Sequence, residues 1–232
     1  MTRCASEAHH TPGGLAWKPP APLPIPIETP RLMLRAYEPS DAGECFRVID
    51  ACRDSLLPWL PWARTDHLNE EASLRAILNW RAELRDTSKL AHIILGVFER
   101  ETGELVGGSG FHDVRPETAS CEVGYWTRPD RRGLGYAGEA TAHLLSRCLL
   151  AQGDGQNDGK DTGGMGFERV RIYCSSANAA SKRIPEKLGL TPEVMQRRDY
   201  HVEGVGPTDR LGWGVLSEEW DAGTHRIKKP AG

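Results

Sequence analysis

The segment Arg131-Arg132-Gly133-Leu134-Gly135-Tyr136-Ala137-Gly138 combines arginines and glycines at the start of a predicted helix. Glycine lets the backbone approach a ligand closely, and the unpaired N–H groups at a helix N-terminus carry about half a positive charge. Such a segment is suited to hold a phosphate or pyrophosphate group. The alternative is a glycine-rich helix start that binds no ligand.

Two phosphate-binding patterns compete for this segment. Gly133, Gly135 and Gly138 match the dinucleotide spacing G-x-G-x-x-G, in which the first glycine directly follows a hydrophobic strand and an acid lies about twenty residues later. Here the glycines follow the polar residues 128–132, and a Gly/Asp-rich stretch occupies the later position. A P-loop is excluded because no Gly-Lys-Ser/Thr follows. A nicotinamide-dependent oxidoreductase is therefore the weakest of the alternatives.

The periodicity of apolar residues predicts the elements that must position this segment. Alternation from Ile27 to Ala36 is typical of a strand, and Ser40-Asp41 and Asn69 offer N-cap side chains to two helices, the first ending near Cys52. Further predicted elements are a hairpin of residues 92–98 and 105–111, a strand at 120–127, a helix at 139–150, a strand at 170–174, a helix at 178–188 and strands at 193–201 and 210–216. The order predicts an α/β fold with a mixed sheet rather than a regular βαβ repeat.

A chain of 232 residues is expected to form one domain, which we place at residues 27–221. The proline-rich residues 1–26 should form a disordered N-terminal arm or an arm that lies on the domain. Residues 152–166 are too polar and glycine-rich to pack and are interpreted as a mobile surface insertion. Residues 222–232 form a C-terminal tail.

The composition limits the classes of partner. A net charge of -3 with interspersed acids and bases gives no electrostatic reason to bind nucleic acid or an anionic membrane. The sequence shows neither an apolar run of transmembrane length nor a secretion-type hydrophobic N-terminus, so we expect a cytoplasmic protein. The six cysteines are widely spaced without a C-x-x-C pair, which favours buried free thiols, and we expect no metal site.

A second pattern, Arg/Gln-x-x-Gly-x-Gly/Ala, is met by Arg132, Gly135 and Ala137 after the strand that ends at Thr127. Together with three further segments, it makes residues 27–221 resemble the GNAT superfamily of N-acetyltransferases, in its RimJ/RimL-like branch, which acetylates N-terminal amines of ribosomal proteins. The three segments are Ile27–Arg35, the Trp-Pro loop Leu57–Ala63 and Asn178–Gly189. The resemblance implies a mixed, strongly twisted sheet with flanking helices, whose two central parallel strands splay apart around acetyl-coenzyme A (acetyl-CoA).

The same resemblance assigns contacts to the coenzyme. The pyrophosphate is expected on the backbone amides of Arg132 to Gly138, and the pantetheine arm beside the strand around Trp126 and Thr127. Asn178 is a plausible helix N-cap on structural grounds alone, and the resemblance adds a contact with the coenzyme.

Acetyl transfer to an amine needs a neutral amine, a polarised carbonyl group and a proton for the departing thiolate. Many members of the superfamily donate that proton from a tyrosine at the position of Pro185, whereas the RimL-like pattern Asn-x-x-Ser implies Ser181. The alternative for Ser181 is a hydroxyl that only bonds the nearby backbone. For the oxyanion, the resemblance implies a backbone N–H near the end of the strand 122–127.

The base that deprotonates the amine has several candidates. The resemblance points to Asp199, which precedes Tyr200 and is short enough that a water relay is expected. An ion-paired, solvated carboxylate is the competing interpretation of Asp199. Glu122 is the second candidate, and a chain of water molecules is the third.

Trp59 and Trp62 form either part of the core or a wall of the acceptor pocket. The expected reaction is transfer of an acetyl group from acetyl-CoA to a primary amine, either a protein N-terminal α-amine or a small molecule. Because the common tyrosine is missing, a catalytically lapsed acyl-CoA sensor is the alternative. The acceptor and the oligomeric state stay open, since loops that build acceptor pockets vary most within a fold.

Overall fold

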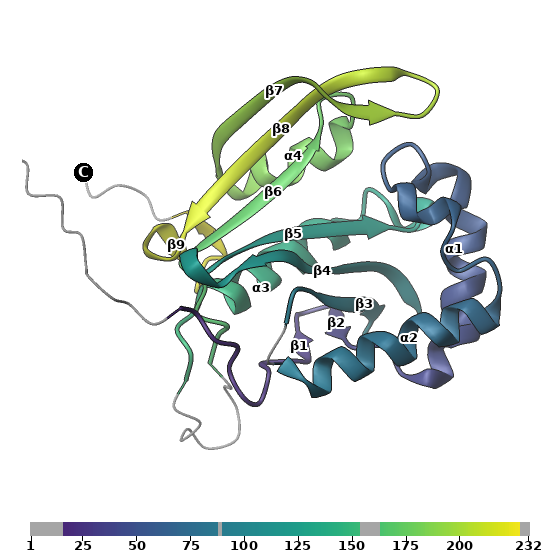
Figure 1. Cartoon of the computed structure of the whole chain (residues 1–232), viewed down its shortest axis with the longest axis horizontal. Coiled ribbons are helices and arrows are strands. Elements are labelled where there is room, and N and C mark those ends of the chain that lie inside the picture. The colour runs from purple at the N-terminus through teal and green to yellow at the C-terminus, as the bar shows by residue number, and fades with distance from the viewer. Residues whose placement is uncertain (1–15, 88–89, 154–162, 228–232) are drawn as a thin grey trace, which may run out of the picture.

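The computed structural model describes residues 16–87, 90–153 and 163–227. An eight-stranded sheet forms the centre, in the order β1-β2-β3-β4-β5-β6-β8-β7 (Figure 1). Its strands are β1 (Ile27–Glu28), β2 (Leu32–Arg35), β3 (Ile93–Glu99), β4 (Leu105–Arg115), β5 (Ser120–Thr127), β6 (Arg169–Ser175), β7 (Thr191–Val202) and β8 (Gly206–Leu216). The helices are α1 (Ala42–Leu56), α2 (Glu70–Arg85), α3 (Tyr136–Leu149) and α4 (Ala179–Leu188), and a short hairpin of β9 (Trp220–Asp221) and β10 (Arg226–Ile227) follows the sheet.

The two parallel strands at the centre of the sheet separate along their length. β5 and β6 pair in parallel through three residue pairs, the last of which is Glu122 with Arg171. β5 continues to Thr127 and β6 to Ser175, but beyond this point β6 pairs only with β8 (Figure 1). The predicted α/β fold with a mixed, splayed sheet is therefore confirmed.

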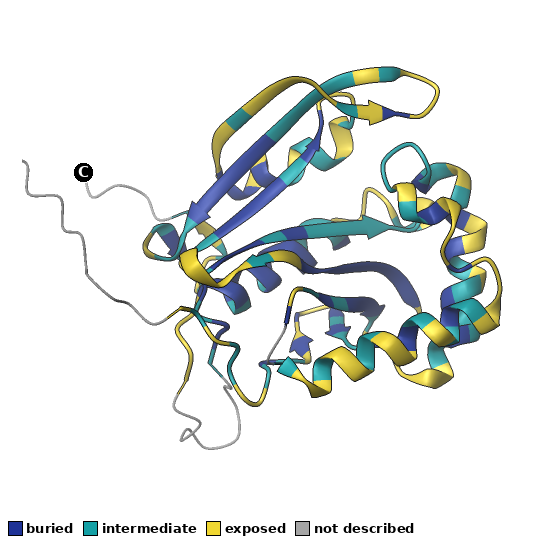
Figure 2. Cartoon of the chain, in the orientation of Figure 1, coloured by how far each residue is buried: buried dark blue, intermediate teal, exposed yellow. Residues whose placement is uncertain are grey.

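Two layers of helices cover opposite faces of the sheet. α3 lies on one face, where Leu144 and Leu145 pack with Val170 and Ile172 of β6 in the larger core. α1 and α2 cover the other face over β2 to β4, with a second core that includes Ile49. Figure 2 shows the buried central strands between the half-exposed helices. The end of the sheet at which β5 and β6 separate is covered by neither layer alone, which leaves room for a site there.

Two predicted boundaries differ from the structure for identifiable reasons. The strand predicted from Ile27 to Ala36 is two short antiparallel strands, because Pro30 has no N–H to donate and Thr29 N–H turns back to bond the Leu32 carbonyl. The helix predicted from residue 139 begins at Tyr136, directly after Gly135, whose φ of 85° ends the preceding loop.

The helix caps agree with the sequence in part. Asn69 accepts a hydrogen bond from Ala72 N at 2.8 Å, and Asn178 accepts one from Ser181 N at 3.1 Å, so both predicted N-caps are confirmed. The expected cap at Asp41 is wrong. Its carboxylate instead accepts hydrogen bonds from Arg35 and from Glu38 N–H, and it makes no side-chain cap to α1.

The ends of the chain and the region around the predicted insertion contact the domain where they are described. Trp17 stacks on Phe167 with ring centroids 4.4 Å apart, so residues 16–26 lie on the domain, the second of the two arrangements expected for the arm. Met165, inside the predicted insertion 152–166, is buried because it is apolar and lies beside Phe167. Residues 1–15, 154–162 and 228–232 lie outside the described part of the chain.

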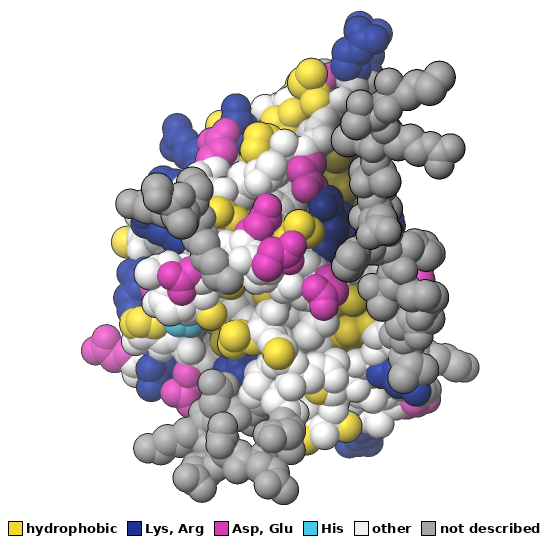
Figure 3. Space-filling view, turned by 90° about the vertical axis from the view of Figure 1, so that its left-hand side faces the viewer, with side chains coloured by type: hydrophobic (Ala, Val, Ile, Leu, Met, Phe, Trp, Pro, Cys, Tyr) yellow, Lys and Arg dark blue, Asp and Glu magenta, His cyan; other side chains and the backbone are white. Residues whose placement is uncertain are grey.

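The remaining features of the fold concern its cysteines, the length of its helices and its surface charges. Cys45, Cys52, Cys121, Cys148 and Cys174 are buried free thiols, while Cys4 lies outside the described residues. Among the helices described, none is long and apolar enough to cross a membrane. Figure 3 shows acidic, basic and apolar side chains interspersed on the face that it presents.

Candidate active site

The loop between β5 and α3 presents uncapped backbone N–H groups. Gly133 and Gly135 adopt φ values of 78° and 85°, a region that side chains with a Cβ rarely occupy, and Gly135 gives α3 no side-chain cap. The first N–H groups of a helix have no acceptor within that helix. A Cβ added at Gly133 or Gly138 would meet no atom within 4 Å, so the space in front of the loop is open. This loop has the donors and the room that a pyrophosphate needs.

A cluster around Glu139 holds the loop and the first turn of α3. Glu139 accepts hydrogen bonds from the Thr29 hydroxyl at 2.6 Å and from Arg31 N–H at 2.9 Å, and it pairs with the Arg31 guanidinium at 2.7 Å. Arg31 also donates to the Leu134 carbonyl at 2.9 Å and lies 4.7 Å from the centroid of the Tyr136 ring. Although burial opposes ionisation, the hydrogen bonds from Thr29 and Arg31 lower the pKa of Glu139. The turn between β1 and β2 thus fixes the phosphate loop.

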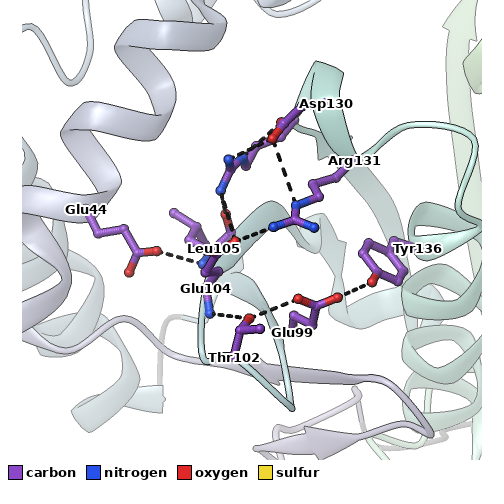
Figure 4. Close-up of polar contacts among 9 residues, drawn as sticks. Glu44, Glu99, Thr102, Glu104, Leu105, Asp130, Arg131 and Tyr136 are labelled. Atoms are coloured by element: carbon purple, nitrogen blue, oxygen red, sulfur yellow. Dashed lines mark hydrogen bonds and ion pairs between the residues drawn. The ribbon is translucent and has the colours of Figure 1, made fainter.

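A second network ties the loop to the turn between β3 and β4 (Figure 4). Arg131 pairs with Glu104, and the Tyr136 hydroxyl donates to Glu99, which lowers the pKa of Glu99 and raises that of Tyr136. Glu44 accepts from Leu105 N–H at 2.8 Å and connects α1 to the same turn. Since these acids bind neighbouring side chains and backbone, the loop is positioned before any ligand arrives.

Ser181 and Tyr125 meet on the α4 side of the opening between β5 and β6. The Ser181 hydroxyl donates to the Tyr125 oxygen at 3.3 Å, and the Tyr125 hydroxyl donates to the Ser181 carbonyl at 3.0 Å. Pro185 lies one turn later and has no N–H with which to bond that carbonyl, which is why the carbonyl accepts from a strand. Burial raises the pKa of Tyr125, so its hydroxyl stays protonated.

The opposite side of β5 carries a different set of side chains, which we call the open face. On it Glu122 and His112 are direct cross-strand partners, and their Oε1 and Nε2 atoms lie 3.2 Å apart. Gly124 follows Glu122 on this face and Trp126 follows Gly124, so a bare stretch of backbone separates the pair from the indole ring.

The loop after α1 closes one end of the open face. Trp62 packs into the core near α2 and contacts the Trp126 ring at 6.4 Å between centroids, while the Trp59 carbonyl accepts a hydrogen bond from Tyr200 at 2.8 Å. Arg64 and Glu203 add an ion pair between the same loop and the β7–β8 turn. Trp62 thus serves the core and also bounds the open face through Trp126, whereas Trp59 contributes a backbone contact.

The remaining candidate residues differ in their partners and in their exposure. Asp199 pairs with Arg210 at 3.0 Å and its side chain is 49% exposed, so a base at this position would have to give up an ion pair. Glu122 is 22% exposed and lies where β5 and β6 separate. Thr127 ends β5 immediately before the phosphate loop, and Arg132 extends to the Ser55 hydroxyl at 3.2 Å.

Sequence reasoning missed three residues that shape this region. The sequence assigned no role to Arg31, and only the contact with Glu139, distant in sequence, reveals one. Tyr125 and His112 had no predicted role, since their partners depend on how the strands and α4 come together. The alternation of β5 could have placed Glu122 and Trp126 on one face and Tyr125 on the other.

Potential metal ligands do not gather in this region: residues 16–87, 90–153 and 163–227 hold no group of three or more His, Cys, Asp and Glu side chains placed to bind a metal ion.

The chain is an α/β domain whose mixed sheet splays next to a glycine-rich helix N-terminus. Residues 31–191, more than half of the chain, match the Acetyltransferase (GNAT) domain family, and the protein belongs to that family of acetyltransferases.

Similar proteins include members named for the RimJ/RimL-like branch. YdaF of Bacillus subtilis, provisionally named a ribosomal N-acetyltransferase, is 23% identical over 190 residues, which cover 82% of this chain and 93% of YdaF. Mycobacterium smegmatis RimJ in complex with CoA-disulfide superposes with a TM-score of 0.71 at 22% identity, covering 87% of this chain and 93% of RimJ. RimL, a ribosomal L7/L12 alpha-N-protein acetyltransferase in complex with coenzyme A, gives 0.67 at 18% identity, covering 83% of this chain and 97% of RimL.

Proposed function

We propose that this protein transfers the acetyl group of acetyl-CoA to a primary amine, and that the acceptor is the N-terminal α-amine of a protein. The observation that carries the proposal is the separation of β5 from β6 after Glu122, directly beside the uncapped N-terminus of α3. A strand edge next to an anion-binding helix start can hold an extended thioester whose other end carries a pyrophosphate.

The chain supplies separate groups for each part of the coenzyme. The amides of Arg132 to Gly138 would bind the pyrophosphate, and the free backbone edge of β5 near Trp126 and Thr127 would align the arm. When bound, acetyl-CoA supplies the activated acetyl group. We keep Asn178 as a helix cap whose coenzyme contact rests on the family resemblance alone.

The proton at the sulfur end is assigned to Ser181 and Tyr125. A serine hydroxyl is a weak acid, so Ser181 would act by donating a hydrogen bond to the sulfur. In the structure its hydrogen lies on Tyr125 and the Tyr125 hydrogen lies on the Ser181 carbonyl, so both hydroxyls rotate before Tyr125 passes a proton to Ser181. For the amine end, the ion pair of Asp199 supports Glu122 over Asp199 as the carboxylate involved.

The open face supports this acceptor class. A Cβ built on Gly124, between Glu122 and Trp126, would meet only the His112 ring, so an extended chain end can lie along this stretch. Trp62 bounds it through Trp126, and the Trp59 backbone lies in the adjoining loop. RimL is named as acting on the α-amine of a ribosomal protein. A ribosomal acceptor would be met in the cytoplasm, the compartment expected from the sequence.

The test replaces Gly135 with valine. A Cβ at this φ of 85° strains the loop and would lie 3.4 Å from Arg31 Nη2, so Gly135→Val should abolish the rise in melting temperature that acetyl-CoA produces. Gly204→Val is the matched control, because Gly204 has a φ of 76° with open space around it in the β7–β8 turn.

Turnover is measured in the same protein by free-thiol release with a panel of N-terminal peptides, polyamines, amino acids and aminoglycosides. Thiol release with a peptide supports the proposal. Stabilisation of the wild type by acetyl-CoA without thiol release for any amine would identify a lapsed sensor instead. Unchanged binding by a folded Gly135→Val variant would contradict the placement of the coenzyme.

A further inference from the structure

We propose that His112 takes the proton from the acceptor ammonium at its Nδ1 atom, and that Glu122 positions the imidazole ring for this transfer. The inference rests on the proposed amine acetylation and names a base within that site. It departs from the sequence-based expectation, in which a carboxylate or a water chain performs this step.

The contact with Glu122 defines the tautomer of His112. A carboxylate oxygen can only accept hydrogen bonds, so we assign the hydrogen of the neutral His112 ring to Nε2, which lies 3.2 Å from Glu122 Oε1. In a neutral imidazole the other nitrogen then has a free lone pair. Nδ1 is therefore the nitrogen that can accept a proton.

The position of the ring directs Nδ1 over the bare stretch of β5. A Cβ built on Gly124 would lie 3.4 Å from His112 Cε1 and 3.8 Å from Nδ1, and no other atom lies within 4 Å of it. The Cε1–Nδ1 edge of the ring therefore borders the space above Gly124. Because Gly124 has no side chain, a small group such as an amine can reach Nδ1 there.

A base must reach the acceptor from solvent, whereas the group that positions it can be more buried, and His112 and Glu122 differ in this way. The His112 side chain is 48% exposed and can meet an incoming acceptor, while Glu122 is 22% exposed and lies against the point where β5 and β6 separate. Their direct register across β4 and β5 holds both Cβ atoms on the open face.

Other charged and titratable groups near the pair lie on β4 itself and on neighbouring strands. Asp113 of β4 pairs with Arg171 of β6 at 3.0 Å and with Arg115 at 2.8 Å, which balances its charge. Tyr200 of β7 interacts electrostatically with Glu122 and donates its hydroxyl hydrogen to the Trp59 carbonyl. Glu122 is consequently the carboxylate left to bind the imidazole.

The step balances without any further reagent. One N–H bond of the ammonium breaks and an N–H bond forms at His112 Nδ1, which leaves a neutral amine and an imidazolium stabilised by Glu122. The amine nitrogen then bonds to the acetyl carbon as the carbon–sulfur bond of acetyl-CoA breaks. The nitrogen releases its second proton to water, and the thiolate receives a proton from the Ser181 end, which is reprotonated by water. His112 returns to its neutral form by releasing its proton to water.

The first experiment measures the tautomer directly, without turnover. The ¹⁵N chemical shifts of the His112 ring should report a hydrogen on Nε2 and none on Nδ1 at pH 8, and Glu122→Gln should weaken that preference. His92, which pairs with Glu83 of α2 at 2.7 Å, is the internal comparison within the spectrum. A hydrogen on Nδ1 of His112 in the wild type would overturn the proposal.

The second experiment compares rates across pH for His112→Ala and the control His92→Ala. At pH 7 an N-terminal amine, with a usual pKa of about 7.7–8.0, is mostly protonated, so loss of the base should lower kcat/KM by roughly 100-fold. Above pH 9 the amine is already neutral and the deficit should shrink to a few-fold. Imidazole added to His112→Ala should restore part of the rate at pH 7, while His92→Ala should behave as the wild type does.

The outcomes separate this inference from the proposed function. A wild type that turns over while His112→Ala keeps the same rate and the same pH profile would overturn the role of His112 and leave acetyl transfer intact. A deficit that is equal at pH 7 and pH 9, with no response to imidazole, would show that His112 only maintains the structure of β4 and β5, and would also overturn it.

Discussion

Pro185 shows how one residue alters the chemistry available around it. Proline removes the hydrogen bond that would tie the Ser181 carbonyl into α4, and that carbonyl instead accepts from Tyr125. The sequence allowed the loosened turn to be predicted, because the spacing of Ser181 and Pro185 is one helical turn. It did not reveal the partner, which comes from a strand 56 residues away in sequence. A tyrosine hydroxyl thus reaches the region of the missing superfamily tyrosine from another element.

This arrangement predicts coupled losses at Ser181 and Tyr125. Ser181→Ala and Tyr125→Phe each break the hydroxyl contact at 3.3 Å, so each should lower kcat by roughly 10- to 1000-fold with little change in acetyl-CoA affinity. The double variant should be little worse than the poorer single one, since the two groups act together. Steady-state kinetics measure kcat. The control is Ser176→Ala, because the Ser176 hydroxyl accepts a hydrogen bond from Asp209 N–H and does not contact Ser181 or Tyr125. Full kcat with weakened coenzyme binding would make Ser181 a binding residue and solvent the proton donor.

Whole elements were predicted more reliably than the residues that join them. β5 was expected at residues 120–127 and has those bounds, because Pro129, which has no N–H to donate, follows shortly after Thr127 and begins a turn. The start of α3 was placed three residues late, since the sequence does not report the positive φ of Gly135. The contacts that fix this helix start, from Thr29 and Arg31, join segments more than 100 residues apart and leave no periodic signal.

The hairpin of β9 and β10 holds α3 through histidines, which predicts sensitivity to acid. The His143 and His225 rings lie 4.0 Å apart between centroids, and His225 Nδ1 is 2.7 Å from the Ser146 hydroxyl. Burial lowers the pKa of both below the ordinary 6.5, and for His143 the neighbouring His225 adds to the effect. The charged groups nearby are Glu139, Arg147 and Asp221.

With both pKa values depressed, the unfolded chain takes up protons before the folded one as pH falls. The stability is fully present above pH 6.5 and is lost as pH decreases through the lower folded values. Urea unfolding at pH 7.5 and pH 5.5 should show a smaller decline for His225→Gln than for the wild type. The control His92→Gln, at a half-buried position before β3, should decline as the wild type does. Equal declines for all three proteins would refute the role of the pair.

At the scale of the molecule, the fold was predictable because its signals are local. Amphipathic stripes, N-caps and alternating strands define the layers, and the motif at residues 132–137 adds the position of the opening. The proposed base was not predictable: the pairing of His112 with Glu122 depends on the register of β4 and β5, which shifts just beyond His112. The glycine-rich composition of residues 152–166 predicted a segment that does not pack, but Met165 within it is buried.

The N-terminal segment and the chain after residue 162 meet on the core, and this contact should support the whole domain. Trp17 stacks on the fully buried Phe167, which in turn contacts Phe111 of β4. The indole N–H of Trp17 donates a hydrogen bond to the Met165 carbonyl at 2.8 Å. Replacing a fully buried tryptophan with alanine lowers the free energy of unfolding by about 3–5 kcal/mol. Because Trp17 is only partly buried, we expect Trp17→Ala to lower it by roughly 2 kcal/mol. Trp17→Phe keeps a stacked ring and loses only the hydrogen bond, so it should cost about 1 kcal/mol. Urea titration measures both. If Trp17→Ala unfolds at the same urea concentration as the wild type, the segment adds no stability, and the core closes over Phe167 without it.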